Sequence, residues 1–169
     1  LIEGGVENVV VVGNVAGAVP GGERRQDSVA AGLDAIGDDG GFVLIHDAAR
    51  PLATARLVRR VIDRLRVADV DGVVPALGVR DTIKRVRGGR VIETVARDDL
   101  VSVQTPQGFD LSALRAAHDA FPSDATDDAA MVEANGGVIA IVDGEPTNIK
   151  VTYPEDLALA EALRSRGHG

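Results

Sequence analysis

Short apolar runs alternate with longer amphipathic stretches along this chain, and the alternation limits the folds that it can adopt. The runs over residues 8–12, 41–47 and 71–77 are typical of strands, and the first is apolar enough for a strand that is buried on both faces. Helices are predicted between them, over residues 27–36 and 54–65. This strand–helix–strand alternation predicts an α/β fold, in which helices flank a mostly parallel, Rossmann-like sheet.

Polar residues mark the expected starts of two helices. Asp27 or Ser28 would cap the helix that begins there. Thr152 and Glu155 have the spacing of a capping box, which predicts a last helix within residues 152–166. The other elements expected after residue 99 are a strand that leads into a polar loop over 100–109, helices over 110–120 and 126–134, and a strand over 137–144. Since no internal repeat or low-complexity linker interrupts the chain, we expect residues 1–169 to form one domain.

Residues 79–95 break the alternation, since two stretches of alternating polar and apolar residues meet at Gly88 and Gly89. Paired glycines between such stretches are typical of a β-hairpin, whose turn needs residues that accept unusual backbone angles. Both stretches carry charged side chains, so we do not expect the hairpin to lie wholly inside a compact domain. We therefore expect residues 79–97 to form a protruding arm that pairs with another subunit.

Composition argues against several classes of protein. The formal net charge is −8 and aromatic residues make up 2% of the chain, which argues against a basic face or a stacking platform for nucleic acid. The chain has no cysteine, so disulfides and thiolate metal sites are excluded, and a reducing cytoplasm is the simplest location. No apolar run approaches the length of a membrane span.

Polar residues follow the strand predicted over residues 41–47, and ligands bind α/β sheets beyond the carboxyl ends of the strands. Asp47 could bind Mg²⁺ together with phosphate oxygens, and the planar guanidinium group of Arg50 could hold a phosphate. Ala48 and Ala49 would leave room for a ligand to approach the backbone. A simple ion pair between Asp47 and Arg50 remains an equally good interpretation.

Other polar segments could contribute to such a site, although each one alone is also typical of an ordinary loop. The glycine pair that ends at Gly22 lies before a predicted helix, where backbone N–H groups can face a ligand. Thr105 and Thr126 lie in polar segments at the ends of other elements. Lys150 has apolar neighbours, so a strand there would point it inward to a site or outward as a solvated edge lysine.

Six segments, taken together and in order, resemble one family of enzymes. They are GGERRQDS, HDAARP, VRDTIKRV, QTPQGF, TDDA and NIKVTYPEDL, and they cover the chain from about Val19 onward. The resemblance is to the 2-C-methyl-D-erythritol 4-phosphate cytidylyltransferases of non-mevalonate isoprenoid synthesis. The related ribitol-5-phosphate cytidylyltransferases have similar motifs but usually carry Ser-Val in place of Ala48 and Ala49, which favours the methylerythritol branch.

The resemblance implies a homodimeric nucleotidyltransferase that moves the cytidylyl group of CTP onto a sugar-alcohol phosphate, releases pyrophosphate and requires Mg²⁺. It implies Asp47 and Lys150 as catalytic residues, with Asp47 also at the metal. The residues implied at the nucleotide are Gly22, Glu23, Ser28, Asp47 and Ala48, and those implied at the sugar-alcohol phosphate are Arg50, Thr82, Arg97, Thr105 and Thr126. Thr82 and Arg97 would reach from the arm into the site of a neighbouring subunit.

The resemblance also implies parts that this sequence does not contain. The family's first strand and its glycine-rich phosphate loop would precede Leu1, and residues 13–18 are too few for a helical crossover after the first predicted strand. Two explanations stay open: a piece of an active enzyme, or a shortened relative that dimerises without catalysis. We expect the chain as written to be weakly active or inactive, because such a loop brings cationic groups to the leaving phosphates.

Overall fold

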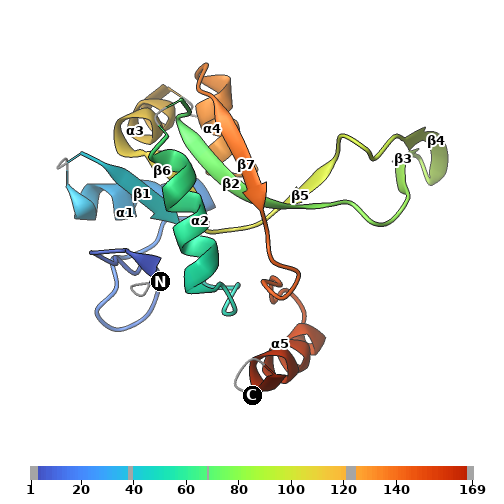
Figure 1. Cartoon of the computed structure of the whole chain (residues 1–169), viewed down its shortest axis with the longest axis horizontal. Coiled ribbons are helices and arrows are strands. Elements are labelled where there is room, and N and C mark those ends of the chain that lie inside the picture. Colours follow the sequence, from blue (N-terminus) through green and yellow to red (C-terminus); the bar gives the residue numbers. More distant parts are fainter. Residues whose placement is uncertain (1–3, 38–39, 68, 121–124, 167–169) are drawn as a thin grey trace.

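The fold is built around a five-stranded sheet with helices on both faces (Figure 1). The computed structural model of the chain describes residues 4–37, 40–67, 69–120 and 125–166. The strands of the sheet are β1 (Phe42–Ile45), β2 (Gly72–Gly78), β5 (Val101–Val103), β6 (Gln107–Asp110) and β7 (Ile139–Asp143). The helices are α1 (Arg25–Ile36), α2 (Ala55–Leu65), α3 (Leu111–Ala120), α4 (Asp128–Ala134) and α5 (Pro154–Arg166). The predicted α/β class is therefore confirmed.

Three strands of the sheet run in one direction. β7 pairs with β2 in parallel, and β1 runs the same way as β2 although β6 lies between them. β5 and β6 run antiparallel to their neighbours. The segment predicted as a strand leading into a polar loop is thus two strands, because residues 104–106 separate β5 from β6 and both pair with β2.

The two faces of the sheet are covered by different helices. On one face, Val61 and Leu65 of α2 pack against Val73 of β2. On the other face, Val74 and Phe109 pack with buried residues of α1, α3 and α4. Val73 and Val74 are neighbours in β2, so the alternation of side chains along a strand puts them in opposite layers. Burial on both sides explains the continuous apolar run over residues 71–77 that predicts this strand.

Thr54 caps α2 where the sequence predicts the helix to begin. Its hydroxyl oxygen accepts a hydrogen bond from the Leu57 backbone N–H, and the hydroxyl group also lies 2.9 and 3.0 Å from the carboxylate oxygens of Glu145. Since replacement of such a cap by alanine costs about 1–2 kcal/mol, we expect Thr54→Ala to lower the free energy of unfolding by that amount. Urea denaturation measures it, with exposed Thr147→Ala as the control; equal stability of the two variants would contradict this account.

Asp110 caps α3 with its carboxylate. Asp110 Oδ1 accepts hydrogen bonds from the Ser112 hydroxyl, the Ser112 N–H and the Ala113 N–H, at 2.5, 2.9 and 3.1 Å. These bonds, that from the Ser112 side chain foremost, hold the pKa of Asp110 below its ordinary value of 3.8 despite partial burial.

The lowered pKa of Asp110 predicts an acid-dependent contribution to stability. The contribution is fully present above the unfolded-state pKa near 3.8 and is lost as the pH falls from there through the lower folded-state pKa. We expect the free energy of unfolding to decrease less between about pH 5 and pH 3 in Asp110→Asn than in the wild type. Exposed Asp99→Asn is the control, and an unchanged slope in Asp110→Asn would show that this cap is not responsible.

The prediction of a strand over residues 8–12 is wrong. Only Val12 makes a bridge, a single parallel one with Val19, and Val9 and Val11 are 52% and 54% exposed. In place of a helical crossover, a short loop joins Val12 to Val19 and is closed by a hydrogen bond from Gly13 N to Val19 O. Within the described part of the chain, no further strand lies beside this run to bury its valines, so the apolar composition alone does not make a strand.

The predicted caps of α1 are also wrong, although the helix itself is present. α1 begins at Arg25, so Asp27 and Ser28 both lie in its first turn. The Asp27 carboxylate accepts a hydrogen bond from the Arg24 N–H at 3.1 Å, and the Ser28 hydroxyl oxygen accepts one from the Gly22 N–H at 3.0 Å. Both side chains therefore bond to backbone N–H groups of the loop before α1 and do not occupy the cap position.

The predicted hairpin is confirmed. β3 (Ile83–Arg87) and β4 (Arg90–Val95) form a separate antiparallel sheet that projects away from the rest of the molecule (Figure 1). Gly88 and Gly89 form its turn at positive φ angles of 55° and 74°, which glycine adopts without strain.

The last predicted helix is present as α5, which stands apart from the sheet (Figure 1). The chain that leads into α5 is held by Asp156, whose carboxylate accepts hydrogen bonds from the N–H groups of Thr152 and Tyr153, and not by the predicted Glu155.

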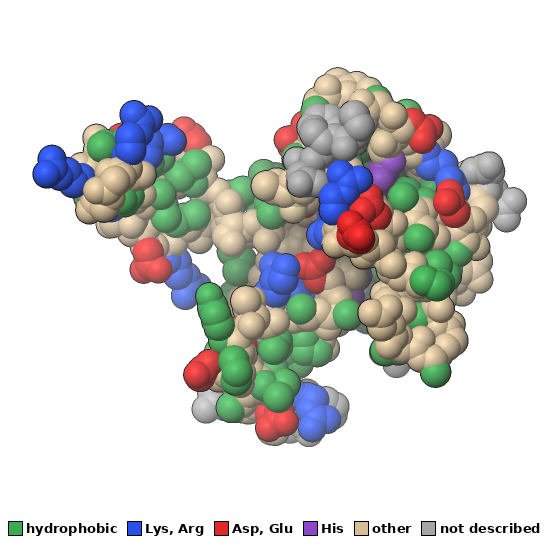
Figure 2. All heavy atoms as spheres, turned by 180° about the vertical axis from the view of Figure 1, so that it is seen from behind, with side chains coloured by type: hydrophobic (Ala, Val, Ile, Leu, Met, Phe, Trp, Pro, Cys, Tyr) green, Lys and Arg blue, Asp and Glu red, His purple; other side chains and the backbone are tan. Residues whose placement is uncertain are grey.

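Figure 2 shows hydrophobic side chains on the surface of both the arm and α5. None of the helices in the described residues is both long and apolar enough to cross a membrane.

Candidate active site

The carboxylate of Asp47 lies between two cationic side chains just beyond the end of β1. Lys150 Nζ lies 3.0 Å from Asp47 Oδ2, and Arg25 Nε lies 3.6 Å from Asp47 Oδ1. Arg25 is the first residue of α1, whereas Lys150 follows β7. Three segments that are distant in sequence therefore meet at the edge of the sheet where the sequence predicts a ligand site.

The surrounding cations keep Asp47 ionised. Burial disfavours the charged carboxylate, but the hydrogen bond from Lys150 and the positive charges of Lys150, Arg25 and Arg50 outweigh it, so the pKa of Asp47 lies below its ordinary value of 3.8. The Lys150 side chain is 50% exposed, so its ammonium group has room to turn toward a ligand. The cluster can thus present a fixed carboxylate and a movable cation to an anionic ligand.

Lys150 reaches the site without the strand that the sequence predicts around it. Residues 148–152 form no strand, but the Val151 N–H donates a 2.8 Å hydrogen bond to the Ala49 carbonyl oxygen. The buried side chain of Asn148 donates another, also of 2.8 Å, to the Thr105 carbonyl oxygen. These two bonds, rather than sheet pairing, hold the segment beside the turn that follows β1.

Arg50 lies beside Asp47 but forms no ion pair with it among the described residues, so the simple ion pair offered by the sequence is wrong. Its guanidinium group donates instead to two backbone carbonyl oxygens, those of Asn148 at 2.9 Å and Val103 at 3.4 Å. The Arg50 N–H also donates to the Asp47 carbonyl oxygen at 2.9 Å, which closes the turn over residues 47–50. Asp47 and Arg50 are therefore held close together by the backbone.

The loop before α1 adds a backbone wall to the site. The Gly22 N–H donates to Ser28 Oγ, and a Cβ atom at Gly22 would lie 2.2 Å from Asp27 Cβ, so only glycine fits there. Glu23 and Ala48 are exposed. Because the loop leads directly into Arg25, the contact between Arg25 and Asp47 brings this loop to the end of β1.

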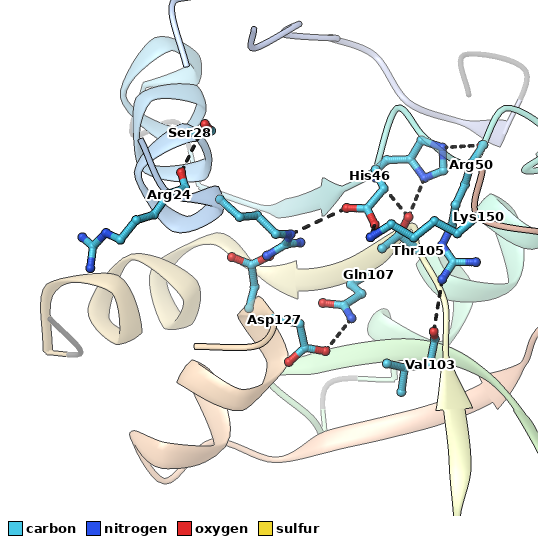
Figure 3. Close-up of polar contacts among 12 residues, drawn as sticks. Arg24, Ser28, His46, Arg50, Val103, Thr105, Gln107, Asp127 and Lys150 are labelled. Atoms are coloured by element: carbon cyan, nitrogen blue, oxygen red, sulfur yellow. Dashed lines mark hydrogen bonds and ion pairs between the residues drawn. The ribbon is translucent and has the colours of Figure 1, made fainter. Parts of the chain in front are cut away.

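The two threonines predicted beside the sugar-alcohol phosphate have different environments. Thr105 is buried, and its hydroxyl oxygen accepts a 3.0 Å hydrogen bond from the Asp47 N–H. Thr126 is exposed and directly precedes Asp127, which accepts a 2.8 Å hydrogen bond from Gln107 Nε2 (Figure 3). Thr105 thus contacts the backbone of Asp47 directly, whereas Thr126 lies on the loop before α4, which is joined to Gln26 of α1.

Thr82 and Arg97 lie elsewhere, at the base of the arm. Both are exposed, and Arg97 donates a hydrogen bond to the Arg80 carbonyl oxygen. The described structure does not bring either residue to Asp47 of the same chain, because the arm strands pair only with each other and project away from the sheet (Figure 1).

The sequence does not predict the roles of Arg25 and Asp128. Asp128 is fully buried, and its oxygens lie 2.7 Å from Arg25 Nη1 and 3.1 Å from His118 Nε2. Arg25 in turn faces Asp47, so the buried Asp128 holds the cation that flanks the predicted catalytic carboxylate. The acidic segment 126–129 draws attention to Asp128, but nothing local to either residue indicates that it meets Arg25.

Known proteins with similar sequences carry two kinds of name. The chain is 54% identical over 145 residues to the bifunctional enzyme IspD/IspF of Solidesulfovibrio magneticus, a match that covers 84% of this chain and 36% of that protein. It is 47% identical over 155 residues to the 2-C-methyl-D-erythritol 4-phosphate cytidylyltransferase of Streptomyces coelicolor, covering 88% of this chain and 57% of that protein. The chain thus spans between about a third and three-fifths of the length of these two relatives.

A solved structure and a family model agree with these relatives. The crystal structure of 2-C-methyl-D-erythritol 4-phosphate cytidylyltransferase from Thermus thermophilus superposes with a TM-score of 0.81 at 39% identity, covering 92% of this chain and 81% of that one. Residues 6–166 match the family model described as IspD, 2-C-methyl-D-erythritol 4-phosphate cytidylyltransferase. This chain therefore belongs to the IspD family of 2-C-methyl-D-erythritol 4-phosphate cytidylyltransferases.

Proposed function

We propose that this chain transfers the cytidylyl group of CTP to 2-C-methyl-D-erythritol 4-phosphate and releases pyrophosphate. The observation that carries the proposal is the ionised Asp47 between Lys150 and Arg25, at the ligand edge of a sheet with the IspD fold. The glycine loop before α1 supplies a wall for the nucleotide, with Gly22, Glu23, Ser28 and Ala48 as its proposed contacts. One relative is named IspD/IspF and the other is named as the cytidylyltransferase, which is the activity by which the family model describes IspD. These names support this activity over a non-catalytic role.

The reaction needs alignment and charge stabilisation more than proton transfer. A phosphate oxygen of the acceptor attacks the α-phosphorus of CTP, a new P–O bond forms, and the bond to the bridging oxygen of pyrophosphate breaks. The attacking phosphate is already anionic at neutral pH, so the site has to hold both anions close and in line. Lys150 suits this task, because its ammonium group can leave Asp47 and follow the negative charge on the reacting phosphates.

The residues present fit a Mg²⁺ ion that is shared with the nucleotide. No cluster of three or more His, Asp or Glu side chains in the described ranges could hold a metal by itself. Mg²⁺ does not need one, since it typically binds one or two carboxylates and takes its other ligands from phosphate oxygens and water. Asp47 would supply that carboxylate, and the bound ion would neutralise charge on the triphosphate.

The acceptor phosphate would lie against Arg50, Thr105 and Thr126. Arg50 and Thr105 are tied to the Asp47 turn, and Thr126 lies on the loop before α4, beside the first turn of α1. The small Ala48 and Ala49 leave the backbone of that turn approachable.

We also propose that the protein acts as a homodimer in which each arm completes the partner's site. Val86, Val91 and Ile92 on the arm are half exposed or more, and contact with a second copy would bury them. Thr82 and Arg97 flank the arm strands, which form a sheet separate from the one that carries Asp47, and this suits a contribution to the partner's site. The acidic composition and the absence of cysteine support a cytoplasmic enzyme that binds small anions rather than nucleic acid.

Pyrophosphate release tests the proposed activity. The purified chain is incubated with CTP and Mg²⁺, and with methylerythritol phosphate or ribitol 5-phosphate as the acceptor. We expect slow release with methylerythritol phosphate only, in line with the weak activity that the sequence predicts. Release with ribitol phosphate only would reassign the acceptor, and release with neither would contradict a catalytic role for this chain.

A further inference from the structure

We propose that His46 is a positioning residue that holds the turn over residues 47–50 in the shape that the active site needs. The inference rests on the proposed function, because the turn carries both Asp47 and Arg50. His46 lies directly after β1 and is partly buried beneath the turn. The proposed reaction does not use its imidazole ring.

The imidazole ring of His46 contacts Arg50, in the turn, and Thr105, which binds the first residue of the turn (Figure 3). Its Nε2 atom lies 3.1 Å from the carbonyl oxygen of Arg50, the last residue of the turn. Its Nδ1 atom lies 3.0 Å from Thr105 Oγ1, and the same hydroxyl oxygen accepts the Asp47 N–H at 3.0 Å. His46 is therefore linked to the first residue of the turn through Thr105 and to the last residue directly.

One assignment of protons satisfies all of these groups. The Arg50 carbonyl oxygen can only accept, so His46 Nε2 carries the hydrogen and donates it. The Thr105 hydroxyl accepts from the Asp47 N–H and donates its own proton to Nδ1. The ring is then the neutral Nε2–H tautomer, in which each of these donors and acceptors has a partner.

The closed set of hydrogen bonds fixes where the reactive groups point. Asp47 donates its N–H to Thr105 and accepts the Arg50 N–H at its own carbonyl oxygen, so its backbone has little freedom. With the backbone fixed, the Asp47 carboxylate stays between Lys150 and Arg25. Both ring nitrogens of His46 are engaged by Arg50 and Thr105, so we assign His46 to positioning and not to catalysis.

Two substitutions can each keep one half of this arrangement. In His46→Asn the amide oxygen can replace Nδ1 as the acceptor for Thr105, but nothing reaches the Arg50 carbonyl oxygen. In His46→Gln the amide nitrogen can replace Nε2 as the donor to Arg50, but the link to Thr105 is lost. Thr105→Val and Thr105→Ser complete the set, because only the serine keeps the hydroxyl group.

NMR of the wild-type chain tests the geometry without requiring turnover. We expect the ¹⁵N signals of His46 to report an unprotonated Nδ1 and a protonated Nε2. Hydrogen exchange of the Asp47 amide should become about tenfold faster in His46→Gln and in Thr105→Val, with less change in His46→Asn and Thr105→Ser. A protonated Nδ1 in the wild type, or equal exchange in all variants, would overturn the inference.

Kinetics separate positioning from a general loss of stability. We expect kcat to fall about tenfold in His46→Gln and in His46→Asn while the KM for CTP stays within about twofold. Thr54→Ala is the matched control, since it should destabilise the fold through α2 without changing kcat or the Asp47 amide. A change in kcat no greater than in Thr54→Ala would overturn the inference. If the wild type released no pyrophosphate, the proposed function would fail, whereas the NMR result would still decide the role of His46.

Discussion

Asp47→Asn is expected to lower the rate of cytidylyl transfer by about a hundred- to a thousand-fold, the loss typical of removing one group that organises charge in a transition state. Asparagine keeps the shape of the side chain but not its charge. It can neither bind Mg²⁺ well nor hold Lys150 and Arg25 at 3.0 and 3.6 Å. Both cations have exposed portions that water can solvate, so we expect the melting temperature to change little by comparison.

Steady-state rates at several Mg²⁺ concentrations measure this effect. Asp34→Asn is the matched control, because Asp34 is an exposed aspartate on α1, the helix that carries Arg25. The control should keep the wild-type rate and the wild-type dependence on Mg²⁺. If Asp47→Asn also kept both, Asp47 would have no part in catalysis or metal binding.

Arg97→Ala is expected to reduce turnover by about a hundredfold, through loss of a cation that the arm brings to the partner's site. The stronger test combines it with Asp47→Asn in mixed dimers. Each variant alone has two damaged sites. A mixed dimer has one site with both substitutions and one intact site, so random mixing should restore about a quarter of the wild-type activity.

The mixing experiment is done by refolding the two variants together and measuring activity against each variant refolded alone. Exposed Arg66→Ala, at the end of α2, is the control for Arg97→Ala and should keep full activity. Activity no higher than the average of the two variants would show that Arg97 does not act across subunits. A monomeric chain in sedimentation experiments would contradict the dimer directly.

Elements with strong local signals could be predicted from the sequence. α2 lies within the predicted range 54–65 and buries its apolar face, because a period of 3.6 residues is a local property of the sequence. The arm hairpin turns at Gly88 and Gly89 for the same reason, since the turn itself requires glycine.

Elements that depend on partners distant in sequence could not be predicted in the same way. The valines of residues 8–12 have the composition of a strand, but a strand also needs a neighbour to pair with, and only Val19 provides a single bridge. The position of β6 between β1 and β2 likewise depends on pairing that no local pattern encodes.

The candidate site also has features that the sequence predicts and contacts that it does not. The ligand edge after β1 follows from the alternation of elements, and the particular residues follow from the family resemblance. The sequence does not indicate that Asp128 anchors Arg25, or that the Thr105 hydroxyl is engaged by His46 and Asp47. Each of these contacts joins segments that are far apart in the chain, so it becomes visible only once the sheet is assembled.

Chemical-shift mapping tests the location of the site most directly. Backbone amides of the isotopically labelled chain are followed while CTP with Mg²⁺, and then methylerythritol phosphate, are added. We expect the largest changes at Gly22, Ser28 and Asp47 with CTP, and further changes at Thr105 and Lys150 with the second ligand. Changes centred instead on the hollow between α1 and α3, near Arg115, would contradict the assignment of the active site to the end of β1.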